Sequence, residues 1–303
     1  MKVLVTGASG FVARHVIAYL SSHGHEPIPT DIAGGPNTGS VTDRSFVLEE
    51  LGKLDFEAIV HLAAIADLSK TTENPYQAFE INSFGTLNVL ELGLRKNVKR
   101  LVYASSANVY GAPKRNPVAE DAPFDPRVPY DFSKVAAESF VMGYHAAKGL
   151  PVSITRSWLL FGEHDAPNRA VPRFIRSCLR NEPVKLFNSG RDTTAPSHAL
   201  NYGKLVARLL ERDAAVGQAF NFGGERSLSI RELAEIVRDI TGSRSEFLML
   251  PPRSEAESEP QVSYPSTAKM RRLLDYEYEL DLEAGLRRTA EWMTASLSAS
   301  AQS

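Results

Sequence analysis

A tyrosine and a lysine, Tyr130 and Lys134, stand four residues apart where the helical pattern after Pro129 begins. On a helix, side chains at this spacing share one face. An ammonium beside a phenol stabilises the phenolate, so we expect the pKa of Tyr130 to fall below its reference value of about 10. The pair predicts a general acid or base working near neutral pH, although the same spacing also occurs by chance on surface helices.

The position of this pair favours chemistry over a surface contact. The helix predicted over 130–148 follows an apolar strand at 100–104, and that strand runs into Ser105 and Ser106. Open parallel sheets bind their ligands beyond the carboxyl ends of their strands. A serine at this strand end can hydrogen-bond the reacting oxygen of a substrate.

A glycine-containing turn near the start of the chain stands between an apolar strand and a helix. Gly7 permits a sharp turn, Gly10 lets the backbone approach a pyrophosphate, and Ala13 is small enough to keep the helix against the sheet. The free N–H groups at the helix start then face the anion. This arrangement predicts a dinucleotide-binding loop.

An acidic residue, Asp31, ends the second predicted strand, about twenty residues beyond the glycine turn. Alone, it would fit an ordinary turn equally well. A carboxylate at this position can accept hydrogen bonds from the adenosine ribose hydroxyls and would repel a 2′-phosphate. Because neither Arg nor Lys lies within 30–35, we predict NAD rather than NADP as the cofactor.

Strand and helix patterns alternate through the first half of the chain, which predicts an α/β fold with a doubly wound parallel Rossmann sheet. The predicted strands are 2–5, 26–30, 58–62, 100–104 and 152–156, and the predicted helices are 12–22, 45–51, 76–96 and 130–148.

The pattern becomes irregular after Trp158, which predicts a smaller, mixed C-terminal lobe that binds substrate. We expect an NAD-binding domain over 1–159, with 196–224 returning to it, and a substrate-binding lobe over 160–303. The proline-rich segment 251–265 fits either a mobile loop over the site or a solvated connector. Further helices are expected at 199–211, 230–241 and 282–297, with a strand at 219–222 and a frayed tail over 298–303.

Composition limits the function. The 303 residues are 43% apolar and 23% charged, with a net charge of −2. No basic block indicates a nucleic-acid partner, and no long apolar run or basic amphipathic stretch indicates a membrane. The single cysteine, Cys178, excludes an intramolecular disulfide and is expected to be an ordinary packed thiol. Because the chain enters a strand directly, with no room for a signal peptide, we predict a cytoplasmic enzyme without a bound metal.

The ordered motifs resemble those of the extended short-chain dehydrogenase/reductases, the NAD-dependent epimerase/dehydratase family, and most closely the UDP-galactose 4-epimerase-like members. The matching segments are 6–11, 60–64, 82–86 and 105–111, followed by Tyr130 and Lys134. The resemblance is close over roughly the first 160 residues.

The resemblance implies a role for each catalytic residue. Tyr130 would take the substrate's hydroxyl proton while hydride passes to NAD, and Lys134 would tune Tyr130 and hold the nicotinamide ribose. Ser106, rather than Ser105, aligns with the partner of the substrate hydroxyl. Asn82 would support the site, and His61 is expected to pack beside the cofactor. The predicted cofactor contacts are Gly7, Ser9, Gly10, Phe11, Val12, Asp31, Ile32, Val41, Leu62, Ala63, Ala64, Asn82, Ala104, Tyr130 and Lys134.

Departures from the family pattern narrow the reaction. Dehydratases and sugar-nucleotide decarboxylases resembling this chain carry an acidic residue just after the catalytic Ser/Thr, where this chain has Ala107 and Asn108. Similarly, Leu159 and Thr194 stand where the family usually has an Asn and an Arg that contact the substrate diphosphate. The leading hypothesis is an epimerase that oxidises and re-reduces a sugar or sugar-nucleotide carbinol. The alternatives are a net dehydrogenase or reductase of a smaller hydroxy or keto compound, and a catalytically silent NAD-binding protein.

The resemblance also suggests a homodimer, in which the helices 76–96 and 130–148 of two copies pack as a four-helix bundle. Apolar residues on these helices support it, with merely solvated outer faces as the alternative. They include Leu87, Leu90, Phe140, Val141 and Tyr144.

Overall fold

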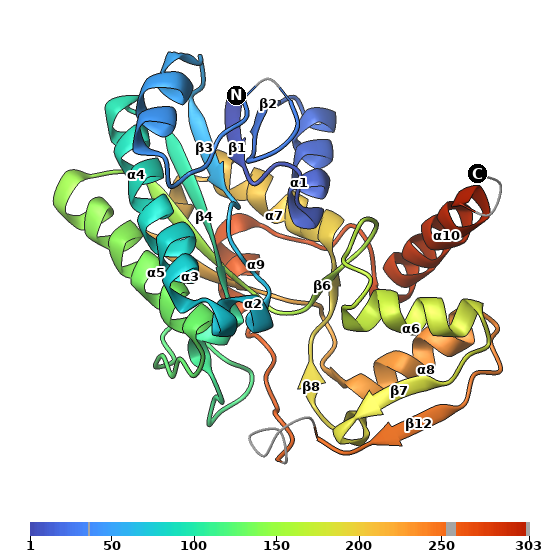
Figure 1. The fold of residues 1–303 in the computed structure, drawn as a ribbon. Helices are drawn as coiled ribbons and strands as arrows, with labels where there is room; N and C mark the ends of the chain where they lie inside the picture. Colours follow the sequence, from blue (N-terminus) through green and yellow to red (C-terminus); the bar gives the residue numbers. More distant parts are fainter. Residues whose placement is uncertain (36, 253–258, 301–303) are drawn as a thin grey trace.

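The computed structural model describes residues 1–35, 37–252 and 259–300, and the core of the fold is a parallel sheet of six strands. The strand order is β10-β5-β4-β3-β1-β2, so the order reverses between β1 and β3 (Figure 1). The predicted doubly wound α/β fold is therefore confirmed. The six strands are β1 Lys2–Thr6, β2 Glu26–Thr30, β3 Ala58–His61, β4 Arg100–Ser106, β5 Val152–Ser157 and β10 Gln218–Phe222.

Apolar side chains on both faces of each central strand explain why the sheet is covered on both sides. In β1, Val3 and Val5 belong to one core cluster and Leu4 to the other, because successive side chains of a strand point to opposite faces. Helices α1 (Phe11–Ser22) and α7 (Ala199–Glu211) pack on the first face. The second face is covered by α4 (Gly85–Arg95) and α5 (Pro129–Lys148), with α2 (Leu68–Glu73), α3 (Pro75–Phe79) and the short η1 (Phe46–Glu50) and η2 (Leu51–Lys53).

The C-terminal lobe has its own apolar core, to which α6, α8 and α10 contribute (Figure 1). Cys178 of α6 is buried there, and burial raises the pKa of its thiol, as expected for a packed and inert cysteine. Three small ladders complete the lobe and its junction, β12–β7, β11–β8 and β6–β9. The bounds are β6 Leu160–Phe161, α6 Ala170–Leu179, β7 Val184–Phe187, β8 Thr193–Thr194, β9 Ser197–His198, β11 Leu228–Ser229, α8 Ile230–Ile240, β12 Phe247–Leu250, α9 Ala268–Leu274 and α10 Leu282–Ser300.

The chain returns from the lobe to the Rossmann sheet, where β10 pairs with β5. Neighbouring elements are connected by two short 3-10 turns, η5 (Asn188–Gly190) and η6 (Asp213–Ala215). The domain boundary at residue 159 stays a prediction. Among the described residues, no helix is both long and apolar enough to cross a bilayer. The cytoplasmic location likewise stays a prediction.

Two of the predicted elements need correction. The helix expected over 76–96 contains a π-helical segment, η3 (Glu80–Phe84), between α3 and α4. The tail expected from residue 298 is wrong as far as Ser300, because α10 continues to that residue, whereas 301–303 lie outside the described residues.

The segment after β12 is tied to both parts of the molecule where it is described. Val118 N donates to Tyr264 O at 2.8 Å, and Thr193 N donates to Gln261 O at 2.8 Å. The Trp158 indole donates to Ser263 Oγ at 2.9 Å. These contacts favour the connector interpretation of this segment, while residues 253–258 lie outside the described part of the chain.

Candidate functional site

The glycine turn after β1 lies at the point where the strand order reverses, and its geometry requires glycine. Gly7 has a φ of +71°, and a Cβ added to it would lie 2.7 Å from the backbone nitrogen of Ala63. Gly10 is the N-cap of α1, whose first two residues are Phe11 and Val12, and its cap carries no side-chain hydrogen bond. Close backbone approach beside an uncapped helix start is the arrangement that holds a pyrophosphate.

Asp31 lies beside this turn, directly after β2. Its carboxylate accepts hydrogen bonds from Ser9 N at 2.8 Å and from Ile32 N at 2.6 Å. The Ile32 side chain is 73% exposed, so it offers an open apolar surface next to the carboxylate. Val41, another predicted cofactor contact, is buried, and its carbonyl accepts a hydrogen bond from Asn88 Nδ2 at 2.9 Å. An apolar surface beside a carboxylate fits the adenosine end of NAD.

A network of hydrogen bonds joins the carboxyl ends of the neighbouring strands β1 and β3. Thr6 Oγ1 accepts hydrogen bonds from Leu62 N and Ala63 N, at 3.2 and 3.3 Å, and pairs with His61 Nδ1 at 2.7 Å. His61 Nε2 lies 3.0 Å from Thr86 Oγ1. Burial lowers the pKa of His61 to about 3, so the ring is neutral and acts as a packing element. The sequence analysis missed the organising role of Thr6, because a threonine at a strand end carries no distinctive signal.

The predicted catalytic residues meet at the carboxyl end of β4. Tyr130 and Lys134 open α5 and are both buried, and Ser106 ends β4. Lys134 Nζ donates to Ala104 O at 2.8 Å and lies 6.0 Å from the centroid of the Tyr130 ring. Ser106 Oγ accepts a hydrogen bond from Asn108 N at 3.2 Å. The structure thus brings the three side chains to one strand end.

The expected lowering of the phenol pKa is wrong. Burial raises the pKa of Tyr130, although the Ser106 hydroxyl and the charge of Arg169 act in the opposite direction. Burial also lowers the pKa of Lys134 to about 8, against the charge of Glu138. In a low-dielectric site both charged forms lose hydration, and this cost exceeds the benefit of their neighbours.

Asn82, on η3, joins the loop after β3 to the catalytic helix. Its Oδ1 accepts from Ile65 N at 2.8 Å, and its Nδ2 donates to Ser133 Oγ at 3.0 Å. This loop begins with Leu62, Ala63 and Ala64, the predicted cofactor contacts. The geometry therefore places Asn82 as a support between that loop and α5.

A buried ion pair, which the sequence analysis did not identify, fixes α5 against β5. Arg156 Nη2 lies 2.8 Å from Glu138 Oε2, and Arg156 Nη1 donates to the Tyr110 hydroxyl at 2.6 Å. Glu138 lies two helical turns beyond Tyr130, on the same helix. Residues paired across two elements leave no local pattern, so spacing alone could not have revealed this contact.

The two departures from the family pattern have packing roles. Leu159 packs against the apolar core of the lobe, and its carbonyl accepts a hydrogen bond from Ser197 N at 3.0 Å. Thr194 lies in β8, paired with Leu228 of β11. Neither side chain can supply the charge-assisted hydrogen bonds that a diphosphate favours.

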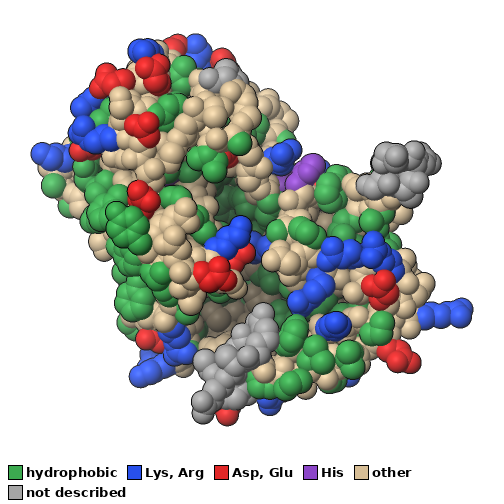
Figure 2. Space-filling model, in the orientation of Figure 1, with side chains coloured by type: hydrophobic (Ala, Val, Ile, Leu, Met, Phe, Trp, Pro, Cys, Tyr) green, Lys and Arg blue, Asp and Glu red, His purple; other side chains and the backbone are tan. Residues whose placement is uncertain are grey.

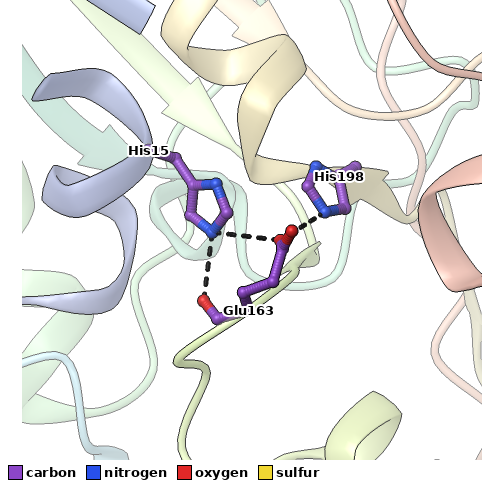
Figure 3. Close-up of side chains that lie close together, drawn as sticks. All are labelled: His15, Glu163 and His198. Carbon is purple, nitrogen blue, oxygen red and sulfur yellow. Dashed lines mark hydrogen bonds and ion pairs between the residues drawn. The ribbon is translucent and has the colours of Figure 1, made fainter. Parts of the chain in front are cut away.

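A second cluster of chemically competent side chains lies between α1 and the lobe. Figure 3 shows Glu163 between His15 and His198. His198 Nε2 lies 2.9 Å from Glu163 Oε2, and His15 Nε2 lies 3.0 Å from the Glu163 carbonyl. Arg288 Nε, on α10, donates to the other carboxylate oxygen.

Hydrogen bonding in this cluster disfavours a metal. His198 Nδ1 accepts from Leu200 N at 3.1 Å, so the proton of this ring is on Nε2, the nitrogen that a metal would need. His15 Nε2 faces a carbonyl acceptor and must carry a proton as well. Burial lowers the pKa of His15 to about 4, which keeps it neutral. Burial alone would raise the pKa of Glu163, but hydrogen bonds from His198 and Arg288 hold it well below its usual range. We call these four residues the clasp, because they join the Rossmann domain to the lobe.

A parallel sheet with a glycine turn at its reversal point, and a Ser–Tyr–Lys set at the same edge with its Tyr and Lys buried, define an oxidoreductase of the extended short-chain dehydrogenase/reductase class. The chain belongs to the NAD-dependent epimerase/dehydratase family, whose model matches residues 3–223. The cofactor is accordingly NAD.

Relatives span nearly the whole chain. It is 28% identical to a putative UDP-glucose 4-epimerase of Methanocaldococcus jannaschii, over 96% of this chain and 98% of that protein. It is 31% identical to UDP-glucuronic acid decarboxylase 1 of Danio rerio, over 98% of this chain and 73% of that one. The structure of a UDP-glucose 4-epimerase from Thermotoga maritima with UDP-glucose matches with a TM-score of 0.90 and 25% identity, over 98% of this chain and 100% of that one.

Proposed function

We propose that this enzyme is an epimerase that inverts a carbinol of a nucleotide sugar through a keto intermediate. One observation carries the proposal. Ser106, Tyr130 and Lys134 meet at the end of β4, while the residues directly after Ser106 are Ala107 and Asn108 rather than an acid. Elimination of water needs a further proton transfer beside the ketone, and this segment offers no carboxylate for it.

Each residue has a distinct part in the proposed reaction. Tyr130 takes the proton from the substrate hydroxyl and later returns it, with Ser106 orienting the same oxygen. Lys134, tethered to Ala104 O, places its charge on the side of the phenol and has further N–H groups for a ribose. Bound NAD supplies a site that accepts hydride and gives it back. The loop after β1 and Asp31 hold the cofactor, and the burial of Tyr130 excludes water.

The alternative is a net dehydrogenase of a smaller hydroxy or keto compound. It is supported by Leu159 and Thr194, whose packing roles leave the usual diphosphate contacts unfilled. The relatives named for UDP-sugars favour the nucleotide sugar. For that reason the epimerase is our leading proposal.

One experiment separates the two. The purified enzyme is incubated with UDP-glucose, UDP-galactose or UDP-glucuronate in D2O, without added NAD, and the sugars are followed by NMR. An epimerase that returns the same hydride gives the inverted sugar without deuterium at the inverted carbon. Oxidation that stops when the bound cofactor is reduced, and resumes only with added NAD, would contradict the proposal and favour the dehydrogenase.

We further propose that a second copy of the chain covers the outer face formed by α3, η3 and α5. The specific residues predicted for this face need correction, because Leu90 and Val141 are fully buried in the protein's own core. The exposed apolar side chains are Tyr76, Phe84 and Phe132, at 79%, 56% and 48% exposure, and Figure 2 shows apolar side chains gathered on this side.

A charged substitution in this face tests the homodimer. Phe84→Glu is expected to convert a dimer to a monomer, because a dimer would bury the carboxylate among apolar groups. Light scattering after size exclusion measures the mass. Leu248→Glu, at a 45% exposed position on β12, is the matched control that should stay dimeric. A wild-type monomer at all concentrations would refute the dimer.

A further inference from the structure

A series of buried hydrogen bonds begins at Thr6, the last residue before the glycine turn. The Thr6 hydroxyl oxygen accepts hydrogen bonds from Leu62 N and Ala63 N, at 3.2 and 3.3 Å. Both of its lone pairs are then used, so its own hydrogen is donated to His61 Nδ1, at 2.7 Å. The proton of the neutral His61 ring is therefore on Nε2.

The series continues through α4 and η3 to the catalytic helix. His61 Nε2 donates to Thr86 Oγ1 at 3.0 Å, and the Thr86 hydroxyl donates to Asn82 O at 2.7 Å. The Asn82 side chain continues it, because its Nδ2 donates to Ser133 Oγ at 3.0 Å. The Ser133 hydroxyl ends the series by donating to the carbonyl of Tyr130 at 2.7 Å. Each donor thus points from the glycine turn towards α5.

Burial makes these bonds strong and costly to break. The first five residues of the series are at most 1% exposed, and Tyr130 is 7% exposed. Away from water, hydrogen bonds that point in the same direction polarise and strengthen one another. Loss of one link leaves a buried donor or acceptor unpaired. We call the whole series the hydrogen-bond chain; its members are Thr6, His61, Thr86, Asn82, Ser133 and Tyr130.

The hydrogen-bond chain is one of two anchors on the first turns of α5. The other is Lys134, whose Nζ donates to Ala104 O at 2.8 Å. Beside the chain, Ser83 Oγ donates to Ser133 O at 2.9 Å, so η3 contacts this part of α5 twice. A π-helical segment such as η3 is frequent at functional sites. The reacting oxygen of Tyr130 must be held closely, because a displacement of about 1 Å can cost a factor of about 100 in rate.

We propose that the hydrogen-bond chain positions Tyr130 relative to the cofactor turn, with Thr86 and Ser133 as positioning residues of the reaction. This inference rests on the proposed function. Both hydroxyls are already engaged within the chain, so they act on the rate through Tyr130 and not by contact with substrate or cofactor. A network that only stabilised the fold could end on any carbonyl of α5, whereas this one ends on the reacting residue.

The central link is tested by removing one hydroxyl. Thr86→Val keeps the shape of the side chain and should lower kcat about 5- to 50-fold, with KM changed less than about threefold, because the phenol is misplaced. Thr86→Ser keeps the hydroxyl and should retain kcat within about threefold of wild type. Steady-state kinetics use whichever of UDP-glucose, UDP-galactose and UDP-glucuronate the wild type inverts.

A matched control separates positioning from stability. Thr289→Val removes another fully buried threonine hydroxyl, which donates to Gly285 O in α10, and should keep the wild-type kcat. If Thr86→Val melted at a lower temperature but also kept the wild-type kcat, the chain would be structural and the proposal would be overturned.

The last link shows whether the chain acts as one unit. Ser133→Ala also breaks it and should lower kcat, even if Thr86→Val fails to fold. The double variant Thr86→Val/Ser133→Ala should lose no more activity than the worse single variant, because both changes interrupt the same chain. Losses that multiply would mean two separate roles and would contradict the proposal.

An ultraviolet titration of the Tyr130 phenol, which needs no substrate, separates this inference from the proposed function. Burial raises the pKa of Tyr130. In Thr86→Val the loosened start of α5 admits water, so the phenol pKa should lie closer to 10.0 than in the wild type, and Thr86→Ser should restore it. If no UDP-sugar is inverted but the pKa changes in this way, the epimerase proposal fails and the chain stands. An identical phenol pKa in Thr86→Val and the wild type would overturn the chain, even in an active epimerase.

Discussion

Two of the buried clusters of titratable side chains, the clasp and the set formed by Tyr130 and Lys134, differ in how fully their hydrogen bonds are satisfied. In the clasp, each imidazole and each oxygen of the Glu163 carboxylate has a protein partner. At the end of β4, Lys134 donates one of its N–H groups to Ala104, and Ser105 Oγ is buried without a partner among the described residues.

This difference distinguishes buried polar groups that stabilise the fold from buried polar groups that take part in the reaction. A saturated cluster stabilises the fold, because each group has exchanged water for a protein partner. An unsaturated cluster keeps donors available for a ligand, and its cost in stability is the usual sign of a functional site. Hence the clasp should govern stability, and the Tyr130 cluster should govern rate.

The largest expected effect is on the rate. Tyr130→Phe removes the proton-transferring hydroxyl and should lower kcat by about 10² to 10⁴, with the melting temperature and NAD binding nearly unchanged. Steady-state kinetics and calorimetry measure these quantities. A variant as active as the wild type would mean that the cluster is catalytically silent and that the comparison fails.

The reverse pattern is expected in the clasp. Glu163→Ala leaves His15, His198 and Arg288 without their carboxylate, so the free energy of unfolding should fall by about 2–3 kcal/mol. Urea denaturation measures it, with the exposed Glu277→Ala as the control. If stability held while kcat collapsed, the clasp would belong to the reaction rather than to the fold.

Asp165 gives a further test of the comparison between stabilising and functional clusters, because its buried carboxylate is expected to lower the free energy of unfolding. Its pKa rises from 3.8 to about 6 on folding, so the folded state binds the proton more tightly, and stability is lost as pH increases from about 4 to 6. Asp165→Asn should therefore raise the free energy of unfolding at pH 8 by about 1–2 kcal/mol and have no such effect below about pH 4. Denaturation at both pH values checks this, beside the exposed control Asp239→Asn. A destabilised variant at high pH would assign Asp165 a structural role.

The Rossmann half was predictable because its signals are local. Alternating apolar patterns predicted both ends of β2 and of α7 correctly. The glycine turn and Tyr130 lie where the topology of a parallel sheet predicts them. The pairing of Glu138 with Arg156 and the assembly of the clasp could not be predicted, because they join residues from separate elements. The pKa of Tyr130 was misjudged since spacing shows a neighbour but not the burial that outweighs it.

The most direct test is a titration of the Tyr130 phenol by ultraviolet difference absorbance, with Tyr130→Phe as the blank. We predict a pKa above the reference value of 10.0 without cofactor, because burial dominates, and a marked fall when NAD+ binds and adds positive charge beside Lys134. Lys134→Met should reduce that fall. A phenol pKa that stayed the same with and without NAD+ would contradict the claim that Tyr130 exchanges the substrate's proton.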